Sequence, residues 1–160
     1  MSLSLKYEPS DRGFTIVEIL VAAFIIVTCF FGIMGVSQKF LALSAHSLKL
    51  TQASFLLEEG AEAVKTIRDD DWNTLFALSV DTPYYLLFSG GKWTLTETVQ
   101  TTDEFTRSIR FSRVYRDSAD QISASGTLDN GTLLGTVTVS WSSAAASSSK
   151  SLSFYIANIL

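Results

Sequence analysis

The sequence predicts an α+β fold, in which the second half of a long N-terminal helix packs on a small antiparallel β-sheet. Residues 19–36 contain no charged side chain, and apolar residues at helical spacing continue beyond them to Arg68. From residue 84 onward, apolar residues instead alternate with polar ones, which is typical of strands with one buried face. A helix followed by antiparallel strands indicates an α+β domain.

The predicted helix begins with an apolar segment, residues 14–36, which is long enough to cross a bilayer. Glu18 lies near its start. A carboxylate costs roughly 2.5 kcal/mol or more at full membrane depth, so Glu18 marks a functional position that needs a partner. Gly32 and Gly35 indicate either close packing against another helix or a weakened point, since each costs a helix about 1 kcal/mol relative to Ala.

The helix is expected to continue through residues 37–68, as the first part of a globular domain over residues 37–160. Three consecutive aspartates then end it. We expect Asp71 to cap a short turn over residues 72–76; a divalent cation site at these carboxylates is the less favoured alternative. One face of residues 37–68 carries an apolar stripe that we expect to lie on the sheet: Leu43, Leu50, Ala53, Leu57, Gly60, Val64 and Ile67.

The sheet is expected within residues 84–160, with the last strand ending at Leu160. Asp129-Asn130-Gly131 predicts a tight turn, which also explains a glycosylation-like Asn130-Gly131-Thr132 pattern, and the Ser/Ala-rich residues 142–151 predict a hairpin tip. Cys29 is the only cysteine, so no intrachain disulfide can form. After a first strand at residues 84–88, the buried faces are expected to carry Trp93, Leu95 and Val99; Phe105, Ile109, Phe111 and Tyr115; Val137, Val139 and Trp141; and Leu152, Phe154 and Ile156.

The residues around the start of the apolar segment resemble the processing site of the type IV pilin superfamily, which comprises pilins, minor pilins and type II secretion pseudopilins. The resemblance rests on Arg12-Gly13-Phe14-Thr15-Ile16-Val17-Glu18 followed by the apolar helix. It implies that residues 1–13 are a leader, which a prepilin peptidase removes by cutting after Gly13, and that Phe14 becomes an N-methylated N-terminus. It further implies that Glu18 pairs with the Phe14 amine of a neighbouring subunit during filament assembly.

The resemblance also implies a place in the cell and a set of partners. Residues 58–72 are similar, more weakly, to PilV-like minor pilins. The implied location is the inner (cytoplasmic) membrane, crossed once, with the C-terminal domain periplasmic or extracellular. The implied partners are other pilin or pseudopilin subunits, prepilin peptidase, the inner-membrane assembly platform and the lipid bilayer. An alternative is a single-pass membrane-anchored binding module with a β-sheet ligand domain, in which Glu18 is a tolerated residue near the interface.

The remaining residues predict neither an enzyme nor a cofactor or metal site. His46 is the only histidine, and no nucleophile elbow or phosphate-binding loop occurs. A net charge of −4 gives no reason to expect a nucleic acid partner. The local exception is a run of four arginines, Arg107, Arg110, Arg113 and Arg116. They indicate either an anionic ligand or, as we favour, ion pairs with Glu97, Asp103, Glu104 and Asp117 together with protection of an edge strand.

Overall fold

The computed structural model describes residues 15–143 and 146–159, and the chain divides into two compact units, Met1–His46 and Ser47–Leu160. The first unit contains the beginning of helix α1 (Ile16–Asp70), and the second contains the rest of α1, helix α2 (Trp72–Phe76) and a β-sheet. The predicted α+β fold, with a long N-terminal helix and an antiparallel sheet, is therefore confirmed.

Helix α1 ends two residues later than predicted, because Asp69 and Asp70 still belong to it. Asp71 then caps α2 as expected: its carboxylate accepts hydrogen bonds from the Asn73 backbone N–H and from the Thr74 hydroxyl, both at 2.9 Å. These hydrogen bonds, that of Thr74 above all, lower the pKa of Asp71.

The three aspartates do not converge on a common point. Asp69 pairs with Arg68, and Asp70 pairs with Lys92. No group of three potential metal ligands occurs within the described residues. The structure thus gives the carboxylates a capping role and two ion pairs, and the cation site gains no support.

The apolar stripe of α1 packs on the sheet as predicted from Leu50 onward. Leu43, in the first unit, is instead 66% exposed. The extended stripe was therefore wrong at its N-terminal end. Within the second unit, the buried residues of α1 are Ala53, Leu57, Gly60, Ala61, Ala63, Val64 and Ile67.

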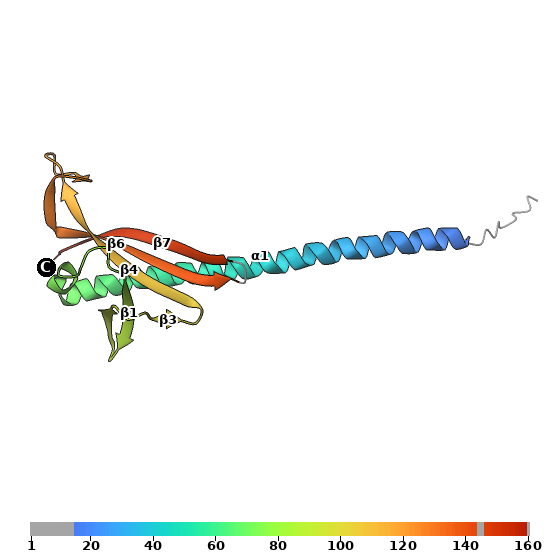
Figure 1. Ribbon diagram of the computed structural model, residues 1–160, viewed down its shortest axis with the longest axis horizontal. Coiled ribbons are helices and arrows are strands. Elements are labelled where there is room, and N and C mark those ends of the chain that lie inside the picture. The colour runs from blue at the N-terminus through green and yellow to red at the C-terminus, as the bar shows by residue number, and fades with distance from the viewer. Residues whose placement is uncertain (1–14, 144–145, 160) are drawn as a thin grey trace, which may run out of the picture. The chain divides into compact units, whose positions relative to one another are not determined.

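The sheet is entirely antiparallel, and its order is β2-β1-β4-β6-β7, with β3 and β5 each paired to β4. Figure 1 shows β4, β6 and β7 running alongside the part of α1 that belongs to the second unit. The strands are β1 (Tyr84–Ser89), β2 (Lys92–Thr96), β3 (Thr101–Thr102), β4 (Phe105–Arg116), β5 (Ile122–Ser123), β6 (Thr127–Ser143) and β7 (Ala146–Ala157).

The core lies between α1 and the inner face of the sheet. Gly60 marks the closest approach: a Cβ atom there would lie 2.9 Å from Val137 Cγ1 and 3.1 Å from Arg107 Cδ. Real Cβ atoms rarely come so close to a branched side chain, so a larger residue would push the helix away from the sheet. The largest fully buried side chains come from α1, α2 and the sheet: Val64, Leu75, Ile109, Phe111, Leu133, Val137, Val139 and Ile156.

A β-bulge corrects the predicted face of β4. The register with β6 shifts between Arg113 and Val114, so that Arg113 pairs with Leu133 while Val114 pairs with Asp129. Beyond the bulge the faces exchange: Val114 is buried, whereas Tyr115, which was predicted to be buried, is 37% exposed.

The same irregularity explains why the predicted turn at Asp129-Asn130-Gly131 is not a hairpin. These residues lie inside β6, where the chain between Asp129 and Leu133 has no counterpart on β4. The Gly131 backbone N–H donates to the Asp129 carboxylate at 2.8 Å, which is a local Asx turn. The turn signal was therefore real, but it marks a bulge within a strand.

Four smaller predictions also differ from the structure. Val99 lies outside the strands and is 57% exposed, and Leu152 is 37% exposed because β7 is an edge strand. The hairpin predicted at residues 142–151 is present, but its tip is shorter than predicted: β6 and β7 pair as far as Ser143 and Ala146, and residues 144–145 lie outside the described part of the chain. The last strand ends at Ala157 rather than at Leu160.

Trp141, which is 3% exposed and packs against the Phe105 ring, tests the assignment of the inner face. Trp141→Ala should lower the free energy of unfolding by about 3–5 kcal/mol, because it leaves a cavity between α1 and the sheet. Phe55→Ala is the matched control: Phe55 is 66% exposed, so its loss should change stability by less than about 0.5 kcal/mol. Urea unfolding of the full chain measures both, and equal effects would contradict the assignment.

Candidate functional site

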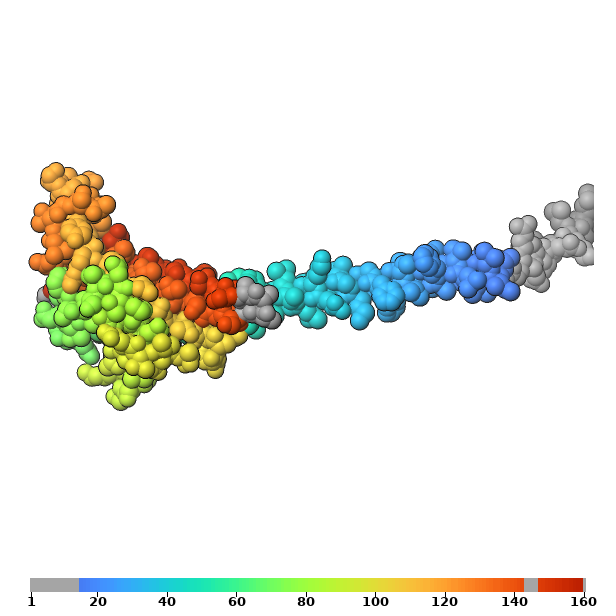
Figure 2. Space-filling model, in the orientation of Figure 1, coloured from blue at the N-terminus to red at the C-terminus, as the bar shows by residue number. Residues whose placement is uncertain are grey.

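The first candidate site is the apolar beginning of α1. Within the first unit its large side chains are exposed, Phe24 by 69%, Phe30 by 74% and Val36 by 70%. Figure 2 shows this segment in blue. By length and composition this is one helix that could cross a membrane. A surface this apolar needs either lipid or other apolar helices around it.

Thr15 and Glu18 define how this helix begins. The Thr15 hydroxyl accepts a hydrogen bond from the Glu18 backbone N–H at 3.3 Å, and the Thr15 carbonyl accepts one from Ile19 at 3.2 Å. Thr15 is thus the N-cap, and Glu18 occupies the first turn, where the helix dipole favours a carboxylate. The sequence interpretation missed this cap, although Thr-x-x-Glu is the spacing of a capping box.

The Glu18 carboxylate is exposed and has no side-chain partner within the residues that the structure describes. It therefore remains available to a group outside the described chain. Gly13 and Phe14, the predicted cleavage residues, lie outside the described residues. The cleavage, the methylation and the pairing of Glu18 with an amine stay predictions.

Gly32 and Gly35 do not interrupt α1. A Cβ atom at either position would meet nothing within 4 Å. The two glycines therefore have no packing role within the described chain, and both readings of them, a contact with another helix or a weakened point, stay open.

The second candidate site is the set of four arginines, all of which lie on β4. Arg107 points toward α1: its guanidinium donates to the Leu56 carbonyl at 3.1 Å and to the Glu59 carboxylate at 2.7 Å. It also lies 5.6 Å from the centre of the Trp93 ring. With only 10% of its side chain exposed, Arg107 joins the helix to the sheet.

Arg113 and Arg110 also have partners within the chain. The Arg113 guanidinium lies 3.9 Å from the centre of the Phe76 ring, a cation–π contact, and donates to the Phe76 carbonyl at 2.8 Å. Arg110 donates to the Asp81 carbonyl. Arg113 therefore anchors α2, and Arg110 anchors the loop before β1.

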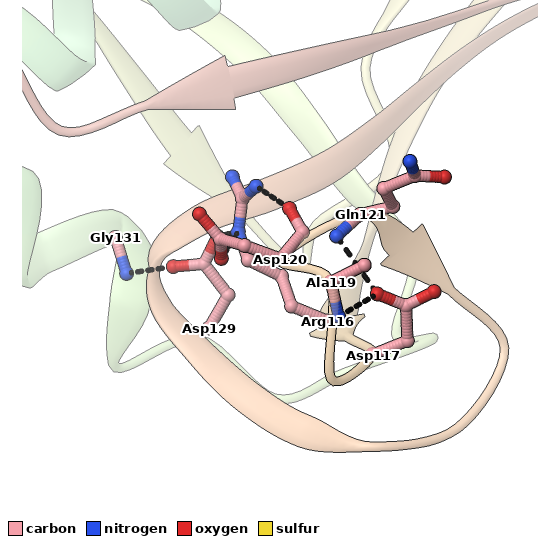
Figure 3. A network of polar contacts seen from close by, with 7 residues as sticks. All are labelled: Arg116, Asp117, Ala119, Asp120, Gln121, Asp129 and Gly131. Atoms are coloured by element: carbon pink, nitrogen blue, oxygen red, sulfur yellow. Dashed lines mark hydrogen bonds and ion pairs between the residues drawn. The ribbon is translucent and has the colours of Figure 1, made fainter.

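Arg116 lies in a polar network at the far end of β4 (Figure 3). Its guanidinium contacts the Asp129 carboxylate at 2.7 Å and donates to the Asp120 carbonyl at 2.9 Å. Asp117 accepts hydrogen bonds from the Ala119 and Gln121 backbone N–H groups, which closes the intervening loop. The hydrogen bond from Arg116 is the main cause that lowers the pKa of Asp129, with further contributions from Thr132 and Gly131.

The intramolecular contacts that we favoured for the arginines are present, but the predicted partners were wrong. None of Glu97, Asp103, Glu104 or Asp117 forms an ion pair with them among the described residues, and Glu104 instead pairs with Lys49. Edge protection was also wrong, because β4 lies between β1 and β6. Each guanidinium thus has a partner inside the described chain, but the exposed Arg110 meets a backbone carbonyl and forms no ion pair among the described residues.

Comparisons with known proteins add no relative: no family model, no curated protein and no solved structure matches this chain. Functional reasoning therefore depends on the residues themselves. The start of α1 is the stronger candidate of the two sites, because its large apolar side chains are exposed and its carboxylate has no side-chain partner in the described chain.

The pKa of Asp129 gives a test of the Arg116 network. A carboxyl group whose pKa is lower in the folded state than in the unfolded state stabilises the fold above its unfolded value, about 3.9. That stabilisation is lost as the pH falls through the folded value. Asp129→Asn should therefore be less stable than the parent at pH 7, and its stability should decline less on acidification.

Urea unfolding at neutral pH and at several acid pH values measures this difference. Asp103→Asn is the control, since the Asp103 side chain has no hydrogen bond among the described residues and Asn tolerates its positive φ of 53°. A decline for Asp129→Asn as steep as that of the parent would show that the network is not a source of acid sensitivity.

Proposed function

We propose that this chain is a structural subunit of a type IV pilus-like filament, a minor pilin or pseudopilin, which is assembled through its apolar N-terminal helix. The observation that carries the proposal is the order of residues at the helix start. Arg12-Gly13-Phe14 leads directly into the apolar segment, residues 14–36, whose one carboxylate, Glu18, is the fifth residue after the proposed cut. The α+β architecture, with the later half of α1 against an antiparallel sheet, supports the same proposal.

The apolar surface supports assembly as well as anchoring. Residues 19–36 expose large apolar side chains all around α1 rather than along one stripe. Such a helix is stable in a bilayer before assembly, and afterwards it is stable among equivalent helices of neighbouring subunits. The same segment then serves as membrane anchor and as the central contact of the filament.

Glu18 supplies the element that distinguishes a filament subunit from a simple anchor. Cleavage after Gly13 would create a free amine at Phe14, and in a dry bundle that ammonium would need a counter-charge. The exposed carboxylate of Glu18, unpaired among the described residues, is suited to provide it from a neighbouring subunit. Charge pairing between subunits would thereby set their stagger along the helix axis.

The proposed function also implies a cellular location and a set of partners for the protein. The precursor would cross the inner membrane once, with the domain of residues 47–160 on the periplasmic or extracellular side. Its partners would be prepilin peptidase, the inner-membrane assembly platform and other pilin or pseudopilin subunits. The proposal applies equally to a pilus, a type II secretion system and a competence filament.

Processing is the first test. Mass spectrometry of the protein from its host should find a mature chain that begins at methylated Phe14. Gly13→Val should abolish the cut, because a peptidase that reads this site needs a residue without a side chain before the bond. Gly35→Val is the matched control and should be cut normally, since a side chain at Gly35 meets nothing within 4 Å.

An uncut parent chain that keeps Met1 would contradict the proposal and favour a membrane-anchored binding module. A Gly13→Val chain that is still shortened at the same bond would show that the site is assigned to the wrong position.

The assembly role of Glu18 is the second test. Glu18→Ala should leave membrane insertion and cleavage intact, because the lone precursor has no partner ammonium. It should prevent incorporation into filaments, since an uncompensated buried charge costs about 3–5 kcal/mol. Glu18→Gln should fail nearly as badly, because an amide does not compensate an ammonium. The fraction of tagged protein in sheared filaments, relative to that in membranes, is the measurement.

Glu58→Ala, which removes an exposed carboxylate from the later part of α1, controls for loss of charge alone and should incorporate like the parent. Incorporation of Glu18→Ala at the level of the parent would remove the assembly role and leave Glu18 as an interfacial residue of an ordinary anchor.

A further inference from the structure

The sheet ends in two edge strands without a further partner strand in the described part of the chain. They are β2, of five residues, and β7, of twelve. Figure 1 shows β7 and β1, the neighbour of β2, on opposite sides of β4. Among the described residues, no hydrogen bond outside the sheet engages a backbone group of β2 or β7. Each edge therefore offers backbone N–H and C=O groups to another strand.

Strand β7 lacks most of the features that keep the edges of natural sheets from pairing. Such edges are commonly very short, interrupted by proline or a bulge, covered, or charged. β7 contains no proline, and its pairing with β6 shows no shift of register. Residues 149–153 are all exposed. The one charged residue of β7, Lys150, donates to the Ser54 hydroxyl of α1 at 2.8 Å. This long edge is thus open to another strand.

The two edge strands run in the same direction. Each neighbouring pair in the order β2-β1-β4-β6-β7 is antiparallel, so four reversals separate β2 from β7. Two copies that point the same way can therefore join β7 of one copy to β2 of the next as parallel strands. Antiparallel pairing of β7 with a second β7 would instead reverse the direction of the second copy.

The apolar side chains of the two edges lie on the same face of the sheet. Trp93 and Leu95 of β2, and Phe154 of β7, pack partly buried against the core. Leu152, which lies opposite the buried Val137, is 37% exposed on that inner face. With β2 of one copy alongside residues 151–155 of another, Trp93 adjoins Leu152 and Leu95 adjoins Phe154. The contact then buries apolar surface that each copy alone leaves partly exposed.

The outer face of the same register brings small polar residues together. Thr94 adjoins Ser153, and both side chains are exposed. Small side chains here leave room for the two strands to approach to the usual spacing of roughly 4.8 Å. Lys92, the charged residue of β2, pairs with Asp70 of its own chain at 3.3 Å. Like Lys150, it is thus engaged within its own copy.

We propose that neighbouring copies of this chain join their sheets edge to edge, with β2 of one copy parallel to residues 151–155 of the next. The contact is heterologous, because each copy contributes a different edge, and a heterologous contact that does not close into a ring builds an open filament. The choice of a partner that points the same way rests on the proposed function, in which every subunit starts from one membrane. The edges themselves belong to the domain of residues 47–160.

An extended segment of another protein could use the same backbone groups of β7, by addition of a strand to the sheet. It would leave β2 without a partner. A second copy engages both open edges at once, and it supplies the matching apolar pair on the inner face. A second copy is therefore the favoured occupant, and the segment of another protein is an outcome of the test.

Disulfide formation between copies tests the contact. Within one chain three strands separate β2 from β7, which places them roughly 19 Å apart at 4.8 Å for each step. A disulfide needs Cα atoms within about 7 Å, so Thr94→Cys/Ser153→Cys, in a Cys29→Ser background, can be linked only between copies. After mild oxidation of the full chain in host membranes and in sheared filaments, a non-reducing gel should show a ladder of covalent multimers.

Variants with one new cysteine, in the same background, show which edges meet. Thr94→Cys alone and Ser153→Cys alone should stay monomeric, and the two expressed together should stop at dimers. Thr94→Cys/Ser147→Cys is the matched control, because Ser147 is also exposed on β7. It lies six residues before Ser153, roughly 20 Å along a strand, so this variant should form no ladder.

A charge placed on the edge gives a second readout, because charged side chains on an edge strand oppose pairing. Ser151→Lys, added to the double cysteine variant, should abolish the ladder. In the parent chain, without any new cysteine, Ser151→Lys should also lower incorporation into filaments. Ser147→Lys, outside the contact, is the control and should change neither. Far-ultraviolet circular dichroism shows whether each variant is folded.

Three results would overturn the inference. The first is the absence of a ladder from the folded double variant in both membranes and filaments; recovery of that variant in filaments would then leave the proposed function standing. The second is dimer formation by Ser153→Cys alone, because β7 would then pair with β7 of a reversed copy. The third is a link from Ser153→Cys to a different protein. A ladder in membranes from a chain that is never cut or found in filaments would support the edge contact and contradict the filament function.

Discussion

The contact between α1 and the inner face of the sheet is the constraint on which the rest of the domain depends. The chain has one cysteine, so no disulfide secures residues 47–160, and apolar burial must overcome the conformational entropy of the whole domain. Small residues make the contact close: Ala53 is fully buried, and Gly60 allows α1 to approach Val137 of β6. Arg107 also joins the helix to the sheet near this point, by hydrogen bonds to the Glu59 carboxylate and the Leu56 carbonyl.

The two parts of α1 carry different patterns of apolar residues, although they form one continuous helix. Up to residue 36 apolar side chains occur all around the helix, and no polar face exists to meet water. From Leu50 onward, only one stripe is apolar, and the remaining faces carry residues such as Glu58, Glu62 and Lys65. The first pattern suits an apolar surrounding on every side, and the second suits a sheet on one side and water on the other.

Regular alternation made much of this fold predictable. Val137, Val139 and Trp141 alternate without interruption, and their burial follows directly from strand geometry. Tyr115 was not predictable in the same way, because its face depends on a bulge that arises in pairing with β6. The bulge depends on pairing with residues of β6 that lie more than ten positions away in the sequence. No local pattern within β4 therefore predicts which face Tyr115 occupies.

Some features of the candidate sites could likewise be predicted from the sequence, and others could not. The carboxylate of Glu18 in an apolar segment could be recognised from sequence alone, and the spacing Thr-x-x-Glu indicated the Thr15 cap. No sequence signal indicated which residues the arginines would contact. Glu59 meets Arg107 only because α1 crosses β4 at that point, and Asp129 meets Arg116 only because the bulge resets the register.

The bulge between Arg113 and Val114 has a consequence for how this domain tolerates change. It divides the pairing of β4 with β6 into two ladders, and only the ladder on the Arg113 side carries the alternation that fills the core. A length change in the lobe beyond it, residues 117–126, would be absorbed there instead of slipping the core register by one residue. The lobe is therefore a natural place for insertions to accumulate, or for an engineer to add a peptide tag, provided that Gly126 is kept. Its φ of 143° and the Arg116 carbonyl beside it leave no room for a side chain.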